Sequence, residues 1–567
     1  MFETLITNAL DALEWKKDKY EPYFNDLIER EITAETVEQW LLDWTKIGNL
    51  VYEVYSRLEV ATTIDTTDEK SDKLRRDFMD NVLPAMMITN NVLNKKLLES
   101  GLEPDGLEVP MRNIRGDAAL FRENNIPLFT EESKIGMEYD KISGSQTVEW
   151  EGQEVTLAQL APIGQEQDRN KREKAWRLAA ERRRQDRDAQ NDLWTKYMVL
   201  RGKVADNTNM PDYRAYKWQD LHRFDYSPED NLRFLDAIEK VAVPAATKIY
   251  EKRRTRLGIE KLRPWDLQVD PLGLDPLRPY ETIEQMEATT ESIFNKVDPQ
   301  LGEYFNIMRK EKLLDLDNRK GKASGGYCTF YSVVKRPFIF MNAVGLHGDV
   351  QTLLHEGGHS FHVFENEHLP YIQQYEIPME FAEVASMAME LLTAPYLAKS
   401  EGGFYTDEEA ARARVEHLEG IITFWPYMAV VDAFQHWIYT NHTEATDPDN
   451  CDTKWTELWE RFMPDVDYSG IEDFRLNRWR RQLHIFQVPF YYIEYGLAQL
   501  GAVQVWAKSL ENQKEAIRNY RKALSLGATS KLPDLFATAG AKLDFDAKTL
   551  KEALELVETT IHQLDPA

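Results

Sequence analysis

The chain has 567 residues, a formal net charge of −27 at pH 7, and 43% hydrophobic residues. This composition is that of a globular protein, and the length predicts roughly two to four domain-sized units. The negative charge argues against binding to nucleic acids or to anionic membranes. No segment approaches the roughly 18 consecutive apolar residues of a transmembrane helix. The N-terminus lacks a signal-peptide pattern, and Cys328 and Cys451 suit a reducing compartment, so we expect a cytoplasmic protein.

Residues 1–100 are predicted to be helical, because apolar residues recur there at helical spacing. They form two stripes: Leu5, Ala9, Leu10 and Leu13, and Val37, Trp40, Leu41, Trp44 and Ile47. Residues 101–165 are rich in Gly and Pro and are expected to be irregular. A small β-hairpin of Thr147–Trp150 and Gln153–Leu157 is the exception. One long charged helix is expected at residues 165–202.

That charged helix carries a basic cluster. The cluster comprises Arg182, Arg183, Arg184 and Arg187. Clusters of this kind occur in nucleic-acid-binding proteins, but acidic residues are interleaved here and the whole chain is acidic. We therefore interpret the cluster as a solvated helix face.

The remainder is predicted to be mainly helical with a short β region. Ser227 precedes a proline and begins a helix, helices are expected at residues 281–312, and Thr406 begins a capping box. Leu262–Val269 is predicted to be an edge strand or extended segment, because it contains a proline. Strand-like residues follow at about 328–342.

A pattern typical of zinc-dependent hydrolases, H-E-x-x-H, lies at His355, Glu356 and His359. On a helix, residues four apart share a face, so both imidazoles can reach one metal ion. Glu356 can then act as general base on a water at the same metal. Asp349 is a good N-cap for this helix.

Two glycines, Gly357 and Gly358, lie inside the same motif. Each costs about 1 kcal/mol relative to Ala in a helix interior. We interpret them as making room for a closely packed neighbour or for the substrate.

The third metal ligand is not given by the motif itself. Reprolysin-like enzymes have the longer pattern H-E-x-x-H-x-x-G-x-x-H, which ends in a third histidine ligand. This pattern is not present here, because His362 stands in place of its glycine and Glu365 in place of its last histidine. A downstream carboxylate is the other common solution. A second helix beginning at Pro378 places three glutamates on one face: Glu380, Glu383 and Glu390. The helix is otherwise apolar, and buried carboxylates need partners such as a metal ion.

The segment His355–His362, followed by the glutamate of Phe381–Ser386, resembles the thimet oligopeptidase and oligoendopeptidase F family of zinc metallopeptidases. The resemblance is closest to the bacterial oligoendopeptidase F branch, which includes Pz-peptidase-like enzymes. It is clearest over residues 320–545, where Lys322–Tyr327 and His484–Tyr495 also resemble family segments.

The resemblance implies one Zn²⁺ per chain with three protein ligands. These ligands are His355, His359 and Glu383. It also implies that Glu356 is the general base. Glu390 and His362 become candidates for residues that orient the ligands.

The aromatic segment His484–Tyr495 is the second place where the sequence points to chemistry. Composition alone favours a core role for its aromatic residues. The resemblance implies that His484 and the tyrosines Tyr492 and Tyr495 hold the substrate carbonyl and stabilise the oxyanion, and that Tyr491 contacts substrate. The spacing is one residue shorter than in thimet oligopeptidase, and Phe486–Pro489 replaces the family's loop glycines. Either Tyr492 or Tyr495 is therefore a candidate hydrogen-bond donor to the oxyanion.

The predicted β region also suggests a substrate contact. An exposed edge strand beside the metal-binding helix would bind peptides through backbone hydrogen bonds. We therefore include Ala343 and Gly345 among the candidate substrate-binding residues.

The resemblance implies a mainly α fold, a two-lobed helical shell around a deep substrate channel, with a small β-sheet beside the zinc helix. We predict a helical N-terminal lobe at residues 1–200 and a catalytic lobe at residues 201–567.

The expected function is zinc-dependent endopeptidase cleavage of short unstructured peptides. The alternatives are a zinc carboxypeptidase on a similar shell, a zinc-retaining peptide-binding protein without catalysis, and a hydrolase of other substrates. Peptides are the expected partners, with no nucleic acid and no membrane, and the protein is expected to be a monomer or a small homo-oligomer.

Overall fold

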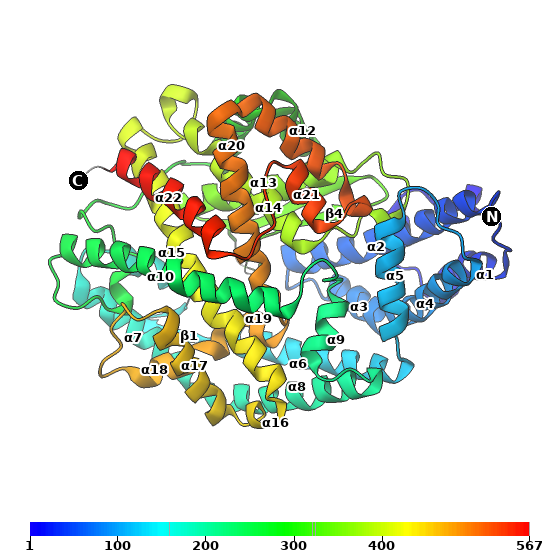
Figure 1. Ribbon diagram of the computed structural model, residues 1–567, viewed down its shortest axis with the longest axis horizontal. Helices are drawn as coiled ribbons and strands as arrows, with labels where there is room; N and C mark the ends of the chain where they lie inside the picture. The colour runs from blue at the N-terminus through cyan, green and yellow to red at the C-terminus, as the bar shows by residue number, and fades with distance from the viewer. Residues whose placement is uncertain (158, 320, 324, 566–567) are drawn as a thin grey trace. The chain divides into compact units, whose positions relative to one another are not determined.

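The computed structural model describes residues 1–157, 159–319, 321–323 and 325–565, so Ser324 lies outside the described residues. The chain is mainly helical with two small sheets, which confirms the predicted fold class (Figure 1). The helices up to the sheet are α1 (Lys17–Glu29), α2 (Val37–Ile64), α3 (Glu69–Asp77), α4 (Leu83–Ser100), α5 (Glu108–Leu120), α6 (Ile126–Gly144), α7 (Arg169–Gln185), α8 (Arg187–Thr208), α9 (Tyr213–Asp220), α10 (Pro228–Arg256), α11 (Ile283–Val297) and α12 (Pro299–Lys310). Those after it are α13 (His347–Glu365), α14 (Met379–Thr393), α15 (Asp407–Thr440), α16 (His442–Ala445), α17 (Pro448–Phe462), α18 (Glu472–Leu476), α19 (Leu483–Phe486), α20 (Tyr492–Leu524), α21 (Leu532–Thr538) and α22 (Ala547–Leu564). The strands are β1 (Thr147–Trp150), β2 (Gln153–Thr156), β3 (Leu314–Asp317), β4 (Tyr327–Tyr331) and β5 (Arg336–Ala343).

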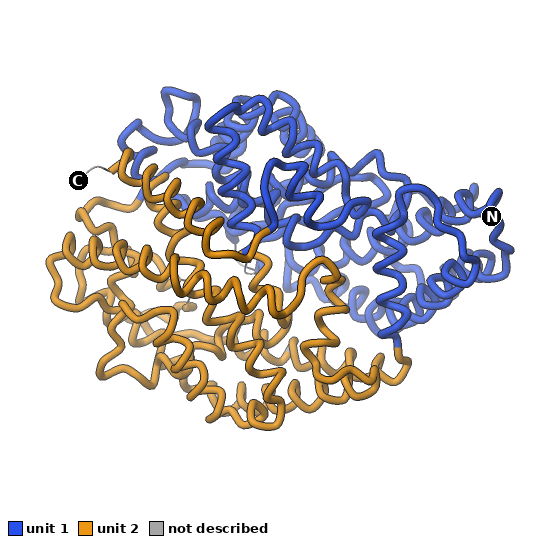
Figure 2. Tube along the Cα trace, viewed as in Figure 1, with its two compact units in different colours: residues 1–121, 277–413, 497–543 blue, residues 122–276, 414–496, 544–567 orange. Residues whose placement is uncertain are grey.

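Two compact units make up the chain, and each is assembled from three separate segments (Figure 2). The first unit comprises residues 1–121, 277–413 and 497–543. The second comprises residues 122–276, 414–496 and 544–567. The sequence predicts one boundary near residue 200, whereas that position lies inside α8 and within the second unit.

The N-terminal helices of the first unit pack through the predicted stripe on α2, whereas the predicted stripe before α1 is only partly confirmed, because Leu5 and Ala9 are buried but Leu10 is 52% exposed. Trp40, Leu41 and Ile47 of α2 are fully buried. The Trp40 indole also donates a hydrogen bond of 2.9 Å to the carbonyl of Leu27 on α1. Full burial of one such apolar side chain contributes about 1.5–3 kcal/mol, so this stripe is a main source of the local stability.

A three-stranded sheet lies in the first unit, in the order β3-β5-β4. The central strand β5 pairs antiparallel with β4 and parallel with β3. The sequence predicts the β region at 328–342, but β3 is missed because its LDLD sequence alternates charged and apolar residues over only four positions. Helix α13 packs on β5 and β4, so the sheet supports the helix that carries the metal motif.

The prediction that residues 101–165 are irregular is wrong for two segments, which form α5 and α6. Pro110 and Pro127 lie in the first turns of these helices. A proline there sacrifices no intrahelical hydrogen bond, so it does not exclude a helix. The β1–β2 hairpin is confirmed, with Thr147 opposite Thr156.

The predicted long helix at residues 165–202 is instead two helices, α7 and α8. Asp186 separates them with φ −91° and ψ 4°. Its carboxylate accepts hydrogen bonds from Gln146 and Arg182, at 2.7 Å each. These side-chain contacts stabilise a break that helical periodicity does not reveal.

Of the two alternatives predicted for Leu262–Val269, an edge strand or an extended segment, the edge strand is wrong. A short 3₁₀ helix forms at Pro264–Asp266, and the fully buried Asp266 carboxylate binds the guanidinium groups of Arg169 and Arg172. The segment is therefore held by a buried ion pair and not by strand pairing. By contrast, the predicted helix start at Ser227 and the predicted capping box at Thr406 are both present.

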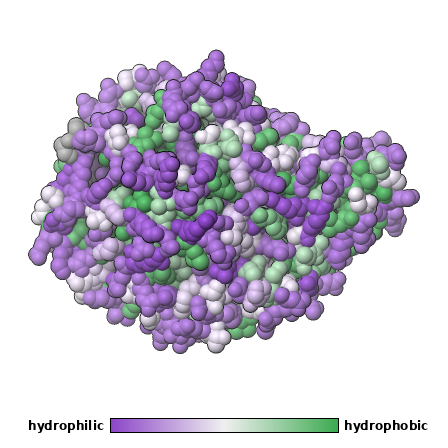
Figure 3. Space-filling view, viewed as in Figure 1, coloured by the Kyte–Doolittle hydropathy of each residue, from purple (hydrophilic) through white to green (hydrophobic). Residues whose placement is uncertain are grey.

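Hydrophilic residues cover most of the face shown in Figure 3, with apolar residues scattered among them. This distribution agrees with the charged composition of the chain. Within the described part of the chain, none of the helices combines the length and apolar character that a membrane crossing requires.

Candidate metal centre and associated aromatic segment

Helices α13 and α14 approach each other very closely in the first unit, and two glycines permit this. A Cβ atom on Gly358 would come within 2.5 Å of the Ala385 carbonyl oxygen and 2.6 Å of the Ser386 Cα atom on α14. A Cβ atom on Gly357 would come within 2.5 Å of the Phe294 ring. Packed neighbours therefore account for both glycines. The close contact brings the glutamates of α14 to the histidines of α13.

The first turn of α13 is fixed by Asp349. The helix begins at His347, three residues earlier than predicted, so Asp349 lies in its first turn and is not the N-cap. Its Oδ2 atom accepts hydrogen bonds of 2.8 Å from the backbone N–H groups of Val344 and Leu346, and the Tyr280 hydroxyl also donates to it. These contacts set the direction of α13 as it leaves β5.

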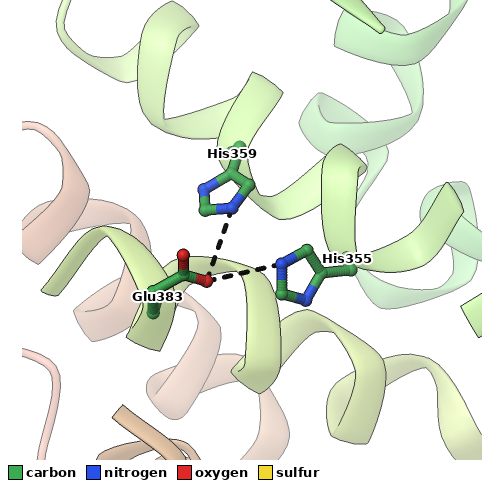
Figure 4. Close-up of side chains that lie close together, drawn as sticks. All are labelled: His355, His359 and Glu383. Atoms are coloured by element: carbon green, nitrogen blue, oxygen red, sulfur yellow. Dashed lines mark ion pairs between the residues drawn. The ribbon is translucent and has the colours of Figure 1, made fainter. Parts of the chain in front are cut away.

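Three side chains from the two helices converge on one point (Figure 4). The Oε2 atom of Glu383 lies 3.4 Å from Nε2 of His355 and 3.6 Å from Nε2 of His359. Among the described residues, these form the one group of three side chains arranged to hold a metal ion. A tetrahedral ion that binds its ligands at about 2.1 Å separates them by about 3.4 Å, so the three atoms fit such an ion.

The ionisation of the cluster also suits a cation. Burial alone would raise the pKa of Glu383, but the two histidines and Ser386 lower it to about 2. Burial lowers the pKa of His359 to about 4. Burial acts in the same direction on His355, yet hydrogen bonds to Glu383 and Glu390 hold its pKa well above the ordinary value. The metal-free cluster thus keeps a proton on His355, which a bound cation would displace.

Glu390 and His362 were both predicted to orient the ligands, and the structure places them differently. The Oε1 atom of Glu390 is 2.7 Å from Nδ1 of His355. His362 is buried against the Phe381 ring, and no hydrogen bond to its Nε2 atom is found among the described residues. Of these two residues, Glu390 is the one with a hydrogen bond to a candidate ligand in the described part of the chain.

Glu356 lies on α13 between the two histidines and is buried. Its Oε2 atom has no hydrogen-bond partner among the described residues. Burial, with the charges of Glu383 and Glu390, raises its pKa to about 7 in the metal-free protein. A buried carboxylate with an unoccupied acceptor atom next to a metal site is arranged to receive a proton.

The prediction of an edge strand at Ala343 is wrong. Ala343 ends the central strand β5, it is buried, and its carbonyl accepts a hydrogen bond from the Asn318 N–H at 3.2 Å. The edges of the sheet are β3 and β4. Gly345 follows β5 with φ +86°, and its N–H donates to the Tyr280 hydroxyl at 2.9 Å.

The aromatic segment predicted to contact substrate lies in the second unit. The His484 ring contacts all three tyrosines, with centroid distances of 4.8 Å to Tyr492, 5.9 Å to Tyr491 and 6.0 Å to Tyr495. His484 belongs to α19, whereas Tyr492 and Tyr495 belong to the first turn of α20. The predicted residues are therefore brought together as one cluster.

A hydrogen-bond chain determines which nitrogen of His484 carries hydrogen. The Tyr427 hydroxyl donates to Oε1 of Gln482 at 2.6 Å, which leaves the Gln482 amide nitrogen to face the imidazole. That nitrogen lies 2.8 Å from Nδ1 of His484. Because it can only donate, Nδ1 accepts, and the neutral imidazole carries its hydrogen on Nε2. His484 is thus prepared to donate from Nε2.

Two buried arginines hold this segment from within the second unit, and sequence reasoning missed both. Arg201 donates to the carbonyls of Ile485 and Phe486, and to the carboxylate of Glu132. Arg223 donates to the carbonyl of Phe490 at 2.7 Å and pairs with Glu494. Neither has a sequence signal, because an isolated arginine is usually exposed.

Phe490 adopts φ +65°, a left-handed conformation that is unusual for a non-glycine residue. Its N–H donates to the fully buried Gln435 side chain, and its carbonyl accepts from Arg223. The backbone between α19 and α20 is therefore fixed on both sides, although the sequence contains none of the glycines found in the family's loop.

The pattern of peptidase family M3 matches residues 163–555, and the peptidase M3 N-terminal domain matches residues 14–107. The chain belongs to peptidase family M3. Among curated proteins of this type, an oligoendopeptidase F homolog of Borreliella burgdorferi is 24% identical over 335 residues, which is 57% of this chain and 54% of that protein. Oligopeptidase PepF of Bacillus subtilis is 26% identical over 278 residues, which is 47% of this chain and 39% of that protein. The match to such relatives thus spans about half of their length or less.

Solved structures resemble this M3 chain over its whole length. Pz peptidase A with inhibitor 2 has a TM-score of 0.89 and 28% identity, and the match covers 100% of both chains. Oligoendopeptidase-F from Enterococcus faecium has a TM-score of 0.63 and 17% identity, covering 99% of each chain. The fold is therefore the helical fold of these peptidases.

Proposed function

We propose that this M3 family member is a zinc-dependent endopeptidase that hydrolyses internal bonds of short unstructured peptides. The observation that carries the proposal is the convergence of His355, His359 and Glu383 beside the unpaired carboxylate of Glu356. A site that only binds peptides has no need of a base at that position.

Two histidines and one glutamate are a common ligand set of catalytic zinc. When bound, the ion would polarise the scissile carbonyl and lower the pKa of a water molecule towards about 7. The hydrogen bond between His355 and Glu390 keeps the imidazole in the tautomer whose Nε2 faces the ion.

Glu356 supplies the proton transfers. It accepts the proton of the attacking water and then donates it to the leaving amine. Its buried position keeps its carboxylate away from competing hydrogen-bond donors. A general base whose pKa lies near the operating pH serves both steps.

We propose that His484, with Tyr495 or Tyr492, donates hydrogen bonds to the substrate carbonyl oxygen as negative charge develops on it. The support is the family resemblance of the segment together with the donor state that Gln482 imposes on His484. One donor of this kind typically contributes about 3 kcal/mol to the barrier reduction. Tyr491 is proposed as a substrate contact next to them.

The experiment is cleavage of a quenched-fluorescent peptide of about ten residues, blocked at both ends. It is run with the purified protein, after a chelator, and after addition of zinc, and the products are identified by mass. Internal cleavage that is lost with the chelator and restored by zinc is the expected result. Cleavage of free-ended peptides alone, at a fixed distance from one end, would indicate an exopeptidase. If no peptide is cleaved, the result would favour a peptide-binding protein without catalytic activity.

A further inference from the structure

A cavity of about 350 Å³ lies within the second unit. Arg183 of α7 and Arg481 line it, together with amide side chains and a serine hydroxyl, and none of its lining residues is acidic. The amides include Gln146, Gln190 and Gln482. Such a lining provides hydrogen-bond donors and positive charge, and no group that would repel an anion.

The positive charge at this cavity is not neutralised by the protein. Burial, together with the charges of Arg481 and Arg478, lowers the pKa of Arg183 to about 10. Arg478 is also the largest cause that lowers the pKa of Arg481. In the described part of the chain, none of these three arginines forms an ion pair with a carboxylate.

This arrangement is unusual for the chain as a whole. The protein has 96 acidic residues against 69 Lys and Arg, so carboxylates are abundant. The neighbours of Arg183 on α7 follow the common pattern, since Arg182 pairs with Asp186 and Arg184 pairs with Glu181. The interpretation of the basic cluster as a solvated face thus holds for Arg184 but not for Arg183.

The cavity is connected to the aromatic segment by Gln482. This residue lines the cavity, and its side-chain nitrogen donates to Nδ1 of His484 at 2.8 Å. A group bound between the arginines would therefore lie next to the residue that positions His484. The cavity belongs to the part of the protein proposed to contact peptide.

We infer that this arginine-lined cavity binds a carboxylate group of the peptide substrate. The inference rests on the proposed peptidase function and adds a substrate preference to it. Guanidinium groups bind carboxylates with paired, charge-assisted hydrogen bonds, and amides complete the coordination of the remaining lone pairs. The volume is at the lower end of ligand sites and suits a terminal residue with its carboxylate.

A carboxylate can come from the C-terminus of the peptide or from an acidic side chain near it. The test therefore uses three fluorescent peptides. Two share one sequence, as a free acid and as a C-terminal amide, and the third is an amide in which the last residue is replaced by glutamate. Dissociation constants are measured by anisotropy with the zinc-loaded Glu356→Gln variant, which prevents turnover. The same peptides are titrated into that variant carrying Arg183→Gln, Arg481→Gln, or both.

The matched control is Arg184→Gln, which makes the same chemical change one residue away at an exposed, paired arginine. The free acid is expected to bind at least about tenfold more tightly than the plain amide. Each cavity variant should reduce this ratio, the double variant should abolish it, and Arg184→Gln should leave it unchanged. Tight binding of the glutamate-containing amide would identify a side-chain carboxylate as an equally good ligand.

Equal affinity for all three peptides would overturn the inference, and so would equal losses in the cavity and control variants. Zinc-dependent internal cleavage would still stand in either case, so the two proposals fail separately. Absence of any peptide binding would overturn this inference together with the proposed function. Because Arg481 is exposed, Arg481→Gln keeps the test valid even if replacing the half-buried Arg183 unfolds the protein.

Discussion

The Oε1 atom of Glu390 lies 2.7 Å from the Nδ1 atom of His355. The two residues are on different helices, α14 and α13, and the contact fixes the imidazole so that Nε2 faces Glu383. A carboxylate in this position also makes the imidazole a stronger ligand, because it stabilises the hydrogen on the far nitrogen.

Replacing Glu390 with Gln should weaken metal binding by about 10- to 100-fold, because the neutral amide orients the imidazole less strongly. The measurement is a zinc titration in competition with a chromogenic chelator. Glu367→Gln, at an exposed glutamate after α13, is the matched control. Equal zinc affinity in both variants would show that Glu390 has no part in positioning His355.

Replacing Glu356 with Gln should leave zinc binding close to that of the unchanged protein and abolish nearly all turnover. The amide has almost the same shape but cannot accept a proton. The measurement combines zinc content by mass spectrometry with kcat on a blocked peptide. Retention of more than a few per cent of kcat would assign the base to another residue.

Gly358→Ala should separate α13 from α14, because the new Cβ atom meets backbone atoms that cannot rotate away. The expected results are a lower Tm and loss of stoichiometric zinc. Gly348→Ala is the control, since it lies in the first turn of the same helix and a Cβ atom there meets nothing within 4 Å. If both variants bind zinc equally, the close approach is not what brings Glu383 to the histidines.

Gln482→Leu should lower kcat by about tenfold, because Nδ1 of His484 loses the donor that keeps hydrogen on Nε2. Gln487→Leu is the control, because Gln487 lies in the same segment but donates to Asp140 and to the Gly136 carbonyl. A change confined to KM would indicate that His484 binds substrate and does not stabilise developing charge.

Burial lowers the pKa of His362 to about 3, against about 6.5 in an unfolded chain. Between these values the unfolded state binds a proton that the folded state does not, so stability falls as the pH falls below 6.5. A single group contributes a slope of up to about 1.4 kcal/mol per pH unit.

The measurement is urea unfolding of the metal-free protein and of His362→Leu at pH 7 and pH 5. The unchanged protein should lose about 2 kcal/mol more than the variant over this interval. The other carboxylates and histidines are the same in both proteins, so their contributions cancel when the two losses of unfolding free energy are subtracted. If the unchanged protein and the His362→Leu variant lose the same free energy of unfolding, His362 is protonated in the folded state at pH 5.

The proximity of His355, His359 and Glu383 was predicted more accurately than the helices and strands around them. His355, Glu356 and His359 follow from spacing on one helix, because four residues separate side chains on one face. Spacing left Glu380, Glu383 and Glu390 as equal candidates, and only the packing of α14 against Gly358 places Glu383 at the histidines.

The residues that the sequence could not reveal act through long-range contacts. Arg201 and Arg183 occur in ordinary charged helices, and nothing local indicates that one holds backbone carbonyls and the other lines a cavity. The break at Asp186 likewise depends on a hydrogen bond from Gln146, which is 40 residues away in sequence. Prolines misled the prediction for α5 and α6, because their effect depends on the turn in which they lie.

The three-segment construction of each unit has a consequence for synthesis of the chain. The first unit is incomplete until residue 543 has been made, and the second until its last segment at 544–567 has been made. A nascent chain that ends soon after Glu383 contains the three candidate ligands but still lacks residues 497–543. This missing segment includes Tyr520, whose hydroxyl donates to the Ala385 carbonyl on α14 at 2.8 Å. The first unit therefore gains its full set of contacts only well after His355, His359 and Glu383 have been synthesised, so a metal ion bound there would be acquired late in translation.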